Sequence, residues 1–410
     1  MTPICLLLCL LSSGAEQPWP QWRGPQRDGT VAHFNLPTRW PDQPAKLWSL
    51  SIGKGYGSPI VAAGHIYVLS NTDDTEHLHG ISLKTGKSAW KVSYPISFKE
   101  NPAALRFGNG PFSTPLYHQG RVFTVGTTGQ IHCLDAASGK VLWKKTYNGD
   151  LTDTRKYFCG NSVSPIIYGN TVIVHIGNES EGIMSAFDVE SGAEKWQWRG
   201  DIPGYASPVI AKVAGEDHMV TLTQKFLNGF DPKTGTLLWQ VPFTSTWREN
   251  AISPMVMGDT VIISGVERQT MALALSRKKG KWKTEKRWVN QEEVLYMSNP
   301  VLYKGTLYGM SYKGKGRFFA MDAATGKTQW QGPARMGKNA AVQLIGNQVA
   351  ALSTDARLRL FTAQPSGFAL VKEYSFDLST VWAEPVFFDG KMLVKDDESL
   401  HLYTFAIGKK

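Results

Sequence analysis

The residues of this chain that could do metal or nucleophilic chemistry are few and scattered. Only two of its four cysteines, Cys133 and Cys159, stand beyond the first fifteen residues, and their spacing matches no metal motif. His77 and His79 are two residues apart without a third ligand near them in the sequence, whereas a zinc site needs three or four ligands. No glycine-rich phosphate loop or nucleophile elbow is present. We therefore expect no metal site and assign no catalytic residue.

A second set of polar and aromatic residues is a candidate for ligand binding. Its members are Arg106, Arg155, Asn161, Arg248, Asn250, Glu267, Lys338, Trp382 and Glu384. Cations, amides, two carboxylates and one indole make up the set. Cations from separate parts of a chain that meet over a concave opening raise the positive potential there. Whether these residues meet depends on the elements that carry them.

A repeated phrase indicates what those elements are. Each copy opens with a proline, continues through a glycine and a β-rich run, and ends in an Asp, a Thr-Gly or Ser-Gly turn and a Trp. The opening prolines are Pro59, Pro115, Pro165, Pro208, Pro254, Pro300 and Pro385. The seventh copy, which begins at Asn339, has lost its proline. Intervals of roughly 42 to 56 residues are the length of a four-stranded propeller blade.

The turn in each copy is the most regular part of the repeat. Gly86, Gly139, Gly192, Gly235 and Gly326 are each followed four residues later by Trp90, Trp143, Trp196, Trp239 and Trp330. Glycine permits the positive φ of a tight hairpin, and the preceding Asp can bind the amides of the turn. A small residue stands two positions before this Asp, or before Ser82, which takes its place in the first copy, so we expect each indole to pack over bare backbone. These Trp residues, together with Trp48, are predicted to be structural docking residues.

The last copy supplies only three strands before the chain ends. The segment AKLWSLS, residues 45–51, reads like the missing Trp-bearing outer strand. We therefore predict an all-β protein, an eight-bladed β-propeller of four-stranded antiparallel blades whose last blade is closed by an N-terminal strand. Residues 1–15 are predicted to be a signal peptide, 16–44 an irregular N-terminal segment, and 45–410 the propeller.

The phrases LDAASGKVLW, FDVESGAEKW, FDPKTGTLLW and MDAATGKTQW resemble the tryptophan-docking motif of the pyrroloquinoline-quinone repeat family. That family includes quinoprotein alcohol dehydrogenases and the non-enzymatic propeller of the outer-membrane β-barrel assembly machinery. The resemblance covers roughly residues 45–405, with degenerate copies in blades five, seven and eight. WRGPQRDG is similar to the leader of secreted family members, and we expect this N-terminal stretch to pack irregularly on the outside of the propeller.

The resemblance leaves two functions open. A dehydrogenase of this family would need a calcium site made of Glu, Asn and Asp oxygens, an Asp base, a planar Trp floor and a disulfide between adjacent cysteines. Glu267, Glu384, Asn250 and Trp382 would have to take such roles, but the chain has no adjacent cysteine pair. We therefore expect a non-catalytic binding or assembly propeller that recognises a ligand or partner at the channel mouth and needs no cofactor. A pyrroloquinoline-quinone-dependent alcohol or sugar dehydrogenase with calcium is the alternative, and a carbohydrate lyase or hydrolase is less favoured because no carboxylate pair is identifiable.

Charge and targeting features suggest where the protein works and what it meets. The first fifteen residues hold an apolar run and end in a small-residue cleavage pattern, Ser13 and Ala15, which indicates a periplasmic or secreted protein. The net charge of +10 favours a protein, acidic glycan or anionic lipid partner. Seven of the basic residues lie in segment 277–287, which we interpret as a solvated hairpin tip. We expect no nucleic-acid partner, no transmembrane span and a monomer.

Overall fold

A computed structural model describes residues 19–32, 34–98, 102, 108–147, 159–177 and 180–406. The predicted signal peptide lies outside these ranges, and so do the predicted site residues Arg106 and Arg155. No helix in the described ranges is both long enough and apolar enough to cross a membrane.

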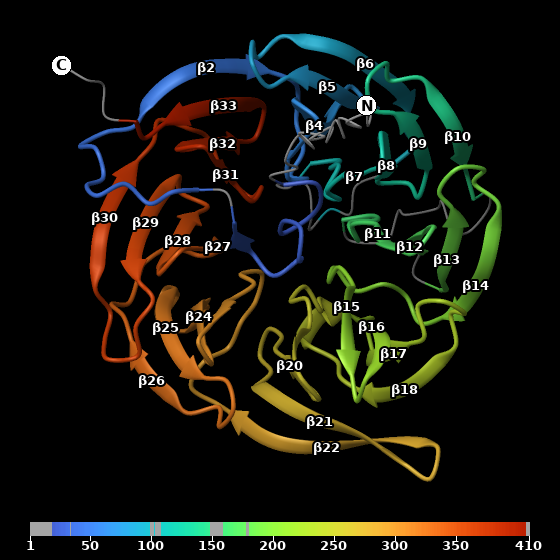
Figure 1. Ribbon diagram of the computed structural model, residues 1–410, viewed down its shortest axis with the longest axis vertical. Coiled ribbons are helices and arrows are strands. Elements are labelled where there is room, and N and C mark those ends of the chain that lie inside the picture. Colours follow the sequence, from blue (N-terminus) through green and yellow to red (C-terminus); the bar gives the residue numbers. More distant parts are fainter. Residues whose placement is uncertain are drawn as a thin grey trace, which may run out of the picture.

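Eight sheets stand in a ring around a central axis, which confirms the predicted eight-bladed β-propeller (Figure 1). Blade one consists of β3 (Ile60–Ala62), β4 (His65–Thr72), β5 (Thr75–Ser82) and β6 (Ser88–Pro95). Blade two consists of β7 (Leu116–His118), β8 (Arg121–Val125), β9 (Ile131–Asp135) and β10 (Val141–Lys145). Blade three consists of β11 (Ile166–Tyr168), β12 (Thr171–Gly177), β13 (Gly182–Asp188) and β14 (Glu194–Gly200). Blade four consists of β15 (Val209–Val213), β16 (Glu216–Leu222), β17 (Phe226–Phe230) and β18 (Leu237–Pro242).

The other four blades follow the same pattern, with the first strand nearest the axis and the fourth at the rim (Figure 1). Blade five consists of β19 (Met255–Met257), β20 (Thr260–Ile263), β21 (Thr270–Lys278) and β22 (Lys281–Asn290). Blade six consists of β23 (Val301–Tyr303), β24 (Thr306–Ser311), β25 (Arg317–Asp322) and β26 (Thr328–Gln331). Blade seven consists of β27 (Ala340–Ile345), β28 (Gln348–Ser353), β29 (Arg357–Thr362) and β30 (Leu370–Ser375). Short 3₁₀ turns, η3 (Thr246–Arg248) and η4 (Lys313–Lys315), precede β19 and β25.

Blade eight closes the ring as the sequence predicted. Its inner strands are β31 (Val386–Phe388), β32 (Lys391–Lys395) and β33 (Ser399–Thr404). The outer strand is β2 (Ala45–Ser51), which pairs antiparallel with β33 from the opposite end of the chain. Because the first and last parts of the chain share one sheet, the blade has no unpaired gap.

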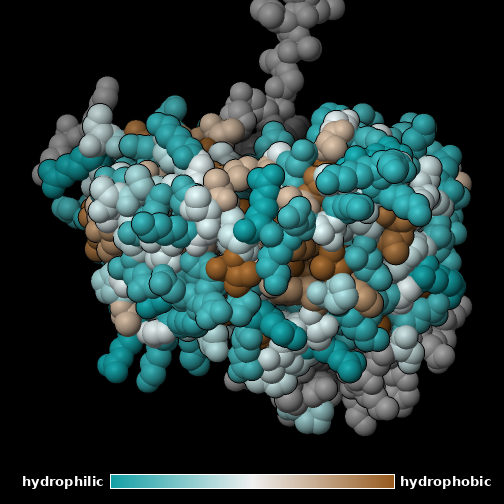
Figure 2. Space-filling model, turned by 90° about the horizontal axis from the view of Figure 1, so that it is seen from below, coloured by the Kyte–Doolittle hydropathy of each residue, from teal (hydrophilic) through white to brown (hydrophobic). Residues whose placement is uncertain are grey.

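The outer strands present one face to solvent. Along β6, exposed and half-buried residues alternate, as they do at the end of β2. The side of the ring seen in Figure 2 is accordingly mostly hydrophilic, with small hydrophobic areas between the polar side chains.

The periodic Trp residues connect neighbouring blades. Trp143 Nε1 donates to Val189 O of blade three at 3.2 Å, and its indole lies over Gly192, where an added Cβ would come within 2.7 Å of the ring. Trp90, Trp196, Trp288 and Trp330 make the corresponding hydrogen bonds to the carbonyls of Ala136, Pro232, Ala323 and Gln364. The turn glycine is therefore needed twice, for a positive φ of 67° to 72° in these repeats and for the indole of the preceding blade.

Three positions depart from this pattern. Trp239 Nε1 donates to His218 Nδ1 of its own blade at 3.0 Å. In blade five the long β21–β22 hairpin replaces the Asp and Gly turn on which the indole would otherwise dock. Trp48 packs over Gly86, although its Nε1 has no hydrogen-bond partner among the described residues. Tyr374 replaces the seventh Trp, and its hydroxyl donates to Pro41 O at 2.7 Å.

The expectation that the WRGPQRDG stretch packs on the outside is wrong. In Figure 1 this N-terminal segment lies in the middle of the ring. Trp19 is fully buried and pairs with Val61 of blade one, Tyr117 N donates to Pro20 O, and β1 (Thr30–Val31) adds a parallel fifth strand to blade seven beside β27. We call residues 19–31 the plug.

Two arginines of the plug explain its position. Arg27 donates from Nε to Pro208 O at 2.9 Å and from Nη1 to Pro165 O at 2.9 Å. Arg23 donates from Nη2 to Pro300 O at 2.8 Å and pairs through Nη1 with Glu384 Oε1 at 3.0 Å. The innermost strands expose carbonyl groups toward the axis, and a guanidinium supplies five donors that can satisfy several of them at once.

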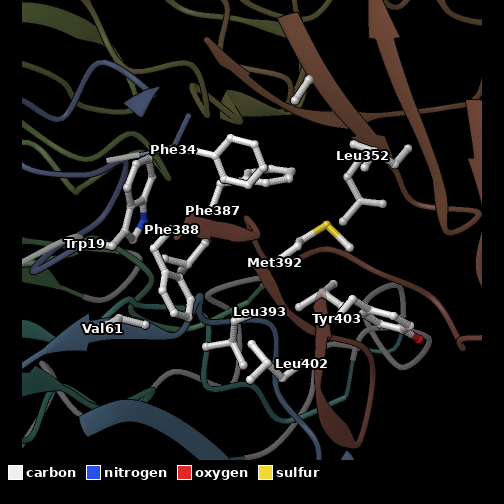
Figure 3. Packing of buried hydrophobic residues seen from close by; sticks show 14 of the residues in the cluster. Trp19, Phe34, Val61, Leu352, Phe387, Phe388, Met392, Leu393, Leu402 and Tyr403 are labelled. Carbon is white, nitrogen blue, oxygen red and sulfur yellow. The ribbon is translucent and has the colours of Figure 1, made fainter. Parts of the chain in front are cut away.

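Apolar packing holds the chain that follows the plug. Phe34 and Trp40 stack at 5.9 Å, and Phe34 meets Phe387 of blade eight edge to face at 5.7 Å. Figure 3 shows this cluster, in which Trp19 and Phe34 lie beside the side chains of β31 and β32. Described residues between Trp19 and Ile52 thus share one hydrophobic core with the last blade.

Replacing a docked Trp should destabilise the propeller. Trp143 is 9% exposed, so Trp143→Ala is expected to lower the free energy of unfolding by about 3–5 kcal/mol, as for other large-to-small core changes. Trp247, which is 69% exposed, is the matched control, and Trp247→Ala should leave stability nearly unchanged. Urea unfolding followed by circular dichroism measures both, and equal effects would contradict the docking role.

Removing an axial arginine should also be costly. Arg23→Ala leaves Glu384 buried without its partner, so we expect a loss of about 3–5 kcal/mol, as when one member of a buried pair is deleted. Arg39, whose side chain is 80% exposed beside Asp42, is the control, and Arg39→Ala should cost no more than about 1 kcal/mol. Equal melting temperatures for the two variants would show that the plug does not stabilise the ring.

Candidate functional site

A cavity of about 1160 Å³, including its mouth, is hollowed among the loops that lead into the innermost strands. Its walls include Tyr56, Phe112, Glu249, Trp382 and Glu384, with Trp22 of the plug among them. We call this cavity the cup. All six of these side chains are aromatic or carboxylate groups, and they come from the plug and from several blades, so the cup is built by the ring as a whole.

Polar residues directly before the opening prolines form a ring at the base of the cup. Glu384 N donates to Ser58 Oγ at 2.8 Å, and Ser58 N donates to Thr114 Oγ1 at 3.3 Å. The series continues from Thr114 N to Ser164 Oγ and from Ser164 N to Ser207 Oγ, each at 3.0 Å. Each hydroxyl therefore bridges one blade to the next, which explains why Ser or Thr precedes so many of the prolines.

Glu384 contributes a carboxylate to this ring of polar residues. It is 9% exposed, and Oε1 accepts from Arg23. Its second oxygen, Oε2, is buried without a hydrogen-bond partner among the described residues. Glu249, another carboxylate of the cup, accepts from the Tyr296 hydroxyl at 2.6 Å.

A groove runs from the cup over blades six, seven and eight. It is lined by Tyr56, Tyr296, Met297, Tyr312, Lys313, Gly314, Lys315, Gly316, Arg335, Gly337, Lys338, Asn339, Thr354, Asp355, Thr380, Trp382 and Asp397. Tyr56, Met297, Asn339, Thr354 and Trp382 line the cup as well. The two hollows therefore meet along one wall of the mouth.

Two loops of the groove cross at backbone distance. Arg335 N donates to Gly314 O at 3.0 Å, and Met336 N donates to Gly316 O at 2.9 Å. A Cβ at Gly316 would lie 1.8 Å from Gly337 O, and the φ of Gly316 is 87°. Glycine is thus required at residue 316, and the crossing fixes where the loop cations stand.

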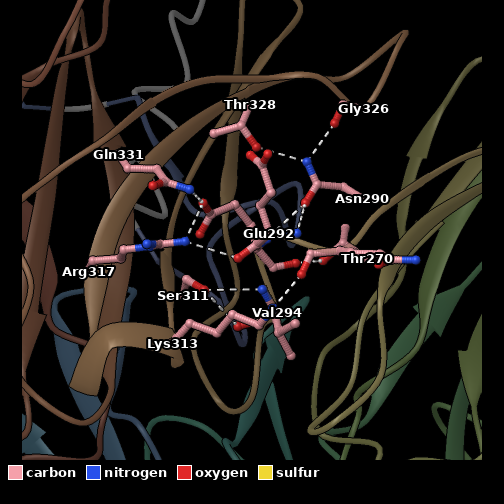
Figure 4. A network of polar contacts seen from close by, with 12 residues as sticks. Thr270, Asn290, Glu292, Val294, Ser311, Lys313, Arg317, Gly326, Thr328 and Gln331 are labelled. Carbon is pink, nitrogen blue, oxygen red and sulfur yellow. Dashed lines mark hydrogen bonds and ion pairs between the residues drawn. The ribbon is translucent and has the colours of Figure 1, made fainter.

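A network of hydrogen bonds around the buried Glu293 holds the base of the η4 loop (Figure 4). Arg317 donates to Glu293 Oε1 and to Glu292 O, both at 3.1 Å, and Gln331 Nε2 donates to Glu293 Oε1 at 2.7 Å. Burial raises the pKa of Glu293, while the Arg317 charge opposes that shift. Lys313 Nζ binds the carbonyl of Gln291. Arg317 and Lys313 therefore use their charged groups in hydrogen bonds within the protein.

Three cations that line the groove are available to a ligand. Lys315, Arg335 and Lys338 are exposed, and none of them forms an ion pair within the described residues. The groove carboxylates have partners of their own, since Asp355 pairs with Arg357 at 3.4 Å and Asp397 interacts with Tyr56, whose pKa is raised mainly by burial. The groove therefore keeps a positive surplus.

The predicted site residues separate into three groups. Lys338 lines the groove, while Trp382 lines both hollows and Glu384 the cup. Asn161 and Asn250 are buried and bind backbone instead: Asn161 accepts from Gly177 N at 2.9 Å, and Asn250 Nδ2 donates to Thr223 O at 2.6 Å.

Arg248 and Glu267 form the third group. Both are exposed and line neither the cup nor the groove. Glu267 accepts from Thr246 Oγ1 at 2.7 Å beside η3. The structure therefore does not bring these two residues to the cup.

Sequence reasoning missed the plug residues Trp22, Arg23 and Arg27, and also Phe112 and Glu249. The signal available for the first three was the unusual stretch WPQWRGPQRDG, with two Arg four residues apart. Burial lowers the pKa of Arg27 to about 9, so this guanidinium still carries its charge at neutral pH.

Neither described thiol is activated as a nucleophile. Cys133 and Cys159 are free cysteines, and burial raises the pKa of each thiol to about 12. Although Cys159 lines the cup, it is a weak nucleophile because only the thiolate reacts readily.

The residues described at the cup do not fit a calcium-bound quinone. Calcium takes six to eight oxygen ligands, and the described residues contain no group of three or more His, Cys, Asp and Glu side chains that could hold a metal ion. The carboxylate that would be most useful, Glu384, already faces the Arg23 guanidinium at 3.0 Å. A divalent cation beside this guanidinium would be repelled.

Comparison with known proteins agrees with the fold. An outer membrane protein assembly factor BamB from Yersinia pestis is 21% identical over 374 residues, which cover 86% of each chain. The BamB of Shewanella oneidensis is 24% identical over 166 residues, 39% of this chain and 38% of that protein. The crystal structure of the quinohemoprotein alcohol dehydrogenase from Comamonas testosteroni superposes with a TM-score of 0.66 at 14% identity, over 97% of this chain and 82% of that one. At this identity the structural likeness shows the propeller fold alone.

A sequence profile decides the family. The profile described as outer membrane protein assembly factor BamB matches residues 97–332. This range holds the repeats of blades two to six, including the regular Gly-Trp turns. The chain therefore belongs to the family of the outer membrane protein assembly factor BamB.

Proposed function

We propose that this protein is a non-catalytic recognition propeller that works in the periplasm or outside the cell and binds an acidic segment of a partner protein in the groove. The observation that supports it most is the surplus of exposed cations, Lys315, Arg335 and Lys338, held by two loops that cross at fixed positions. Fixed cations over a hollow attract acidic surfaces and discriminate against basic ones.

Other features of the chain agree with a protein partner. Tyr296 and Tyr312, with ring centroids 6.4 Å apart, add aromatic contact area to the groove, and aromatic residues are enriched where proteins bind one another. Relatives in the family are named outer membrane protein assembly factors. The predicted signal peptide would carry the chain across the inner membrane, to the side on which the outer membrane lies.

Charge reversal in the groove tests the proposal. The variant Lys315→Glu/Arg335→Glu should bind a fluorescent poly-glutamate peptide about tenfold or more weakly at low salt, because two attractions become repulsions. Added salt should weaken binding by the wild type and narrow the difference between the two proteins. Fluorescence anisotropy measures both effects.

The basic hairpin supplies the control. Lys279→Glu/Lys281→Glu changes the net charge by the same amount on exposed residues of the β21–β22 turn, and it should leave the affinity nearly unchanged. An equal loss in both variants would show that only net charge matters and would refute the groove. Binding of sulfated glycans or anionic vesicles in preference to the peptide would show that the partner is not a protein.

A further inference from the structure

The cup differs from the groove in its charge, and it therefore suits a different ligand. No Lys or Arg is among the described residues that line it, whereas Glu249 and Glu384 do so. The Glu384 charge is balanced by Arg23. An anion would meet two carboxylates, and a cation would meet the paired guanidinium behind one of them. A neutral ligand avoids both costs.

The plug gives the cup a flat apolar floor. Arg23 Cζ and Arg27 Cζ lie 5.7 Å and 5.3 Å from the centroid of the Trp22 ring. Both guanidinium groups are buried and neither lines the cup, whereas Trp22 does. The cations thus lie behind the indole and hold it in place, and the aromatic rings of Phe112 and Tyr56, 5.7 Å apart, stand at the wall.

One hydrogen-bond acceptor in the cup lacks a donor. Glu384 Oε2 is buried and unpaired among the described residues, while the remainder of this side chain is fixed by Arg23 and by the hydrogen bond from Glu384 N to Ser58. A buried polar atom without a partner is expensive. A ligand that places a hydroxyl group there would supply the missing donor.

Hydroxyl groups that can donate hydrogen bonds line the same cavity. The hydroxyls of Ser58, Thr114, Ser164 and Ser207 each accept a backbone N–H and line the cup. A hydroxyl that accepts one hydrogen bond still has its own hydrogen to donate. Asn299 and Asn339 add amide groups to the same cavity.

We infer that the cup binds a neutral pyranose sugar, free or at the end of a glycan chain. One C–H face of the ring stacks on Trp22, whose π-face carries negative charge density. A sugar hydroxyl donates to Glu384 Oε2, and neighbouring hydroxyls exchange hydrogen bonds with the Ser and Asn side chains of the cup. This site goes beyond the groove function and does not depend on it.

Direct binding measurements test this inference. Methyl glycosides of glucose, galactose, mannose and N-acetylglucosamine are titrated into the full mature protein, and saturation-transfer NMR follows each one. We expect millimolar or tighter binding of at least one glycoside, with the strongest saturation on the C–H protons of one ring face and a change in Trp fluorescence. No binding by any of the four would overturn the inference.

Variants locate the site. Glu384→Gln should weaken glycoside binding about tenfold or more, because a charge-assisted hydrogen bond is lost. Since this change also weakens the pair with Arg23, Trp22→Leu provides a second test that removes the aromatic floor and keeps an apolar side chain. Trp247→Ala, which removes an exposed indole from the η3 turn outside the cup, should leave binding unchanged. Unaltered affinity in both cup variants would refute the site.

Two further comparisons distinguish sugar binding in the cup from binding in the groove and from binding of planar rings. Lys315→Glu/Arg335→Glu should bind the glycoside as well as the wild type does, so that a failure of the groove and a failure of the cup give different results. A preference for pyrroloquinoline quinone or another flat aromatic acid over all four glycosides would mean that the floor selects planar rings, and it would overturn the sugar assignment.

Discussion

The structure depends on how the carbonyl groups at the axis find hydrogen-bond donors. In each blade the innermost strand has one edge that faces the axis, and these edges converge at the centre of the ring. Arg27 and Arg23 reach the carbonyls of Pro165, Pro208 and Pro300 there. Each guanidinium joins segments that are distant in sequence, which turns a ring of separate sheets into one connected body.

This arrangement also determines the shape of the mouth. Because the plug lies at the axis and places Trp22 against the cavity, the mouth becomes a cup with a floor. Burying two cations is costly, as the lowered pKa of Arg27 indicates. The backbone carbonyls and Glu384 offset that cost when they lie within hydrogen-bond distance of the guanidinium groups. These contacts fix the positions of Arg23 and Arg27, and with them the indole of Trp22.

The features that the sequence predicted well are local and repeated. Gly139 and Trp143 are four residues apart in one turn, and the same offset in other copies made the blades, their number and their Trp columns readable. The closing strand was predictable because β2 carries the missing piece of the same repeat. In both cases a pattern in the chain is itself the structural unit.

The features that the sequence did not reveal rest on contacts between distant segments. Arg23 and Glu384 are separated by 361 positions, and Arg27 and Pro208 by 181. No short-range pattern encodes these pairs. The Trp- and Arg-rich stretch WRGPQRDG was therefore predicted to lie on the outside of the propeller. The reverse error concerned Asn250, whose side chain satisfies backbone groups instead of facing the mouth. A polar residue in a loop has the same sequence signature in either role.

The N-terminal region thus contributes more to the mouth than its length suggests. It provides the floor through Trp22, the counter-ion of Glu384 through Arg23, a fifth strand to blade seven through β1, and the closing strand of blade eight through β2. The chain enters blade seven through the groove cations Arg335 and Lys338, and it enters blade eight through the shared wall at Trp382. The segment that precedes the repeats therefore shapes the cup directly, and through β1 and β2 it extends two of the blades whose loops line the groove.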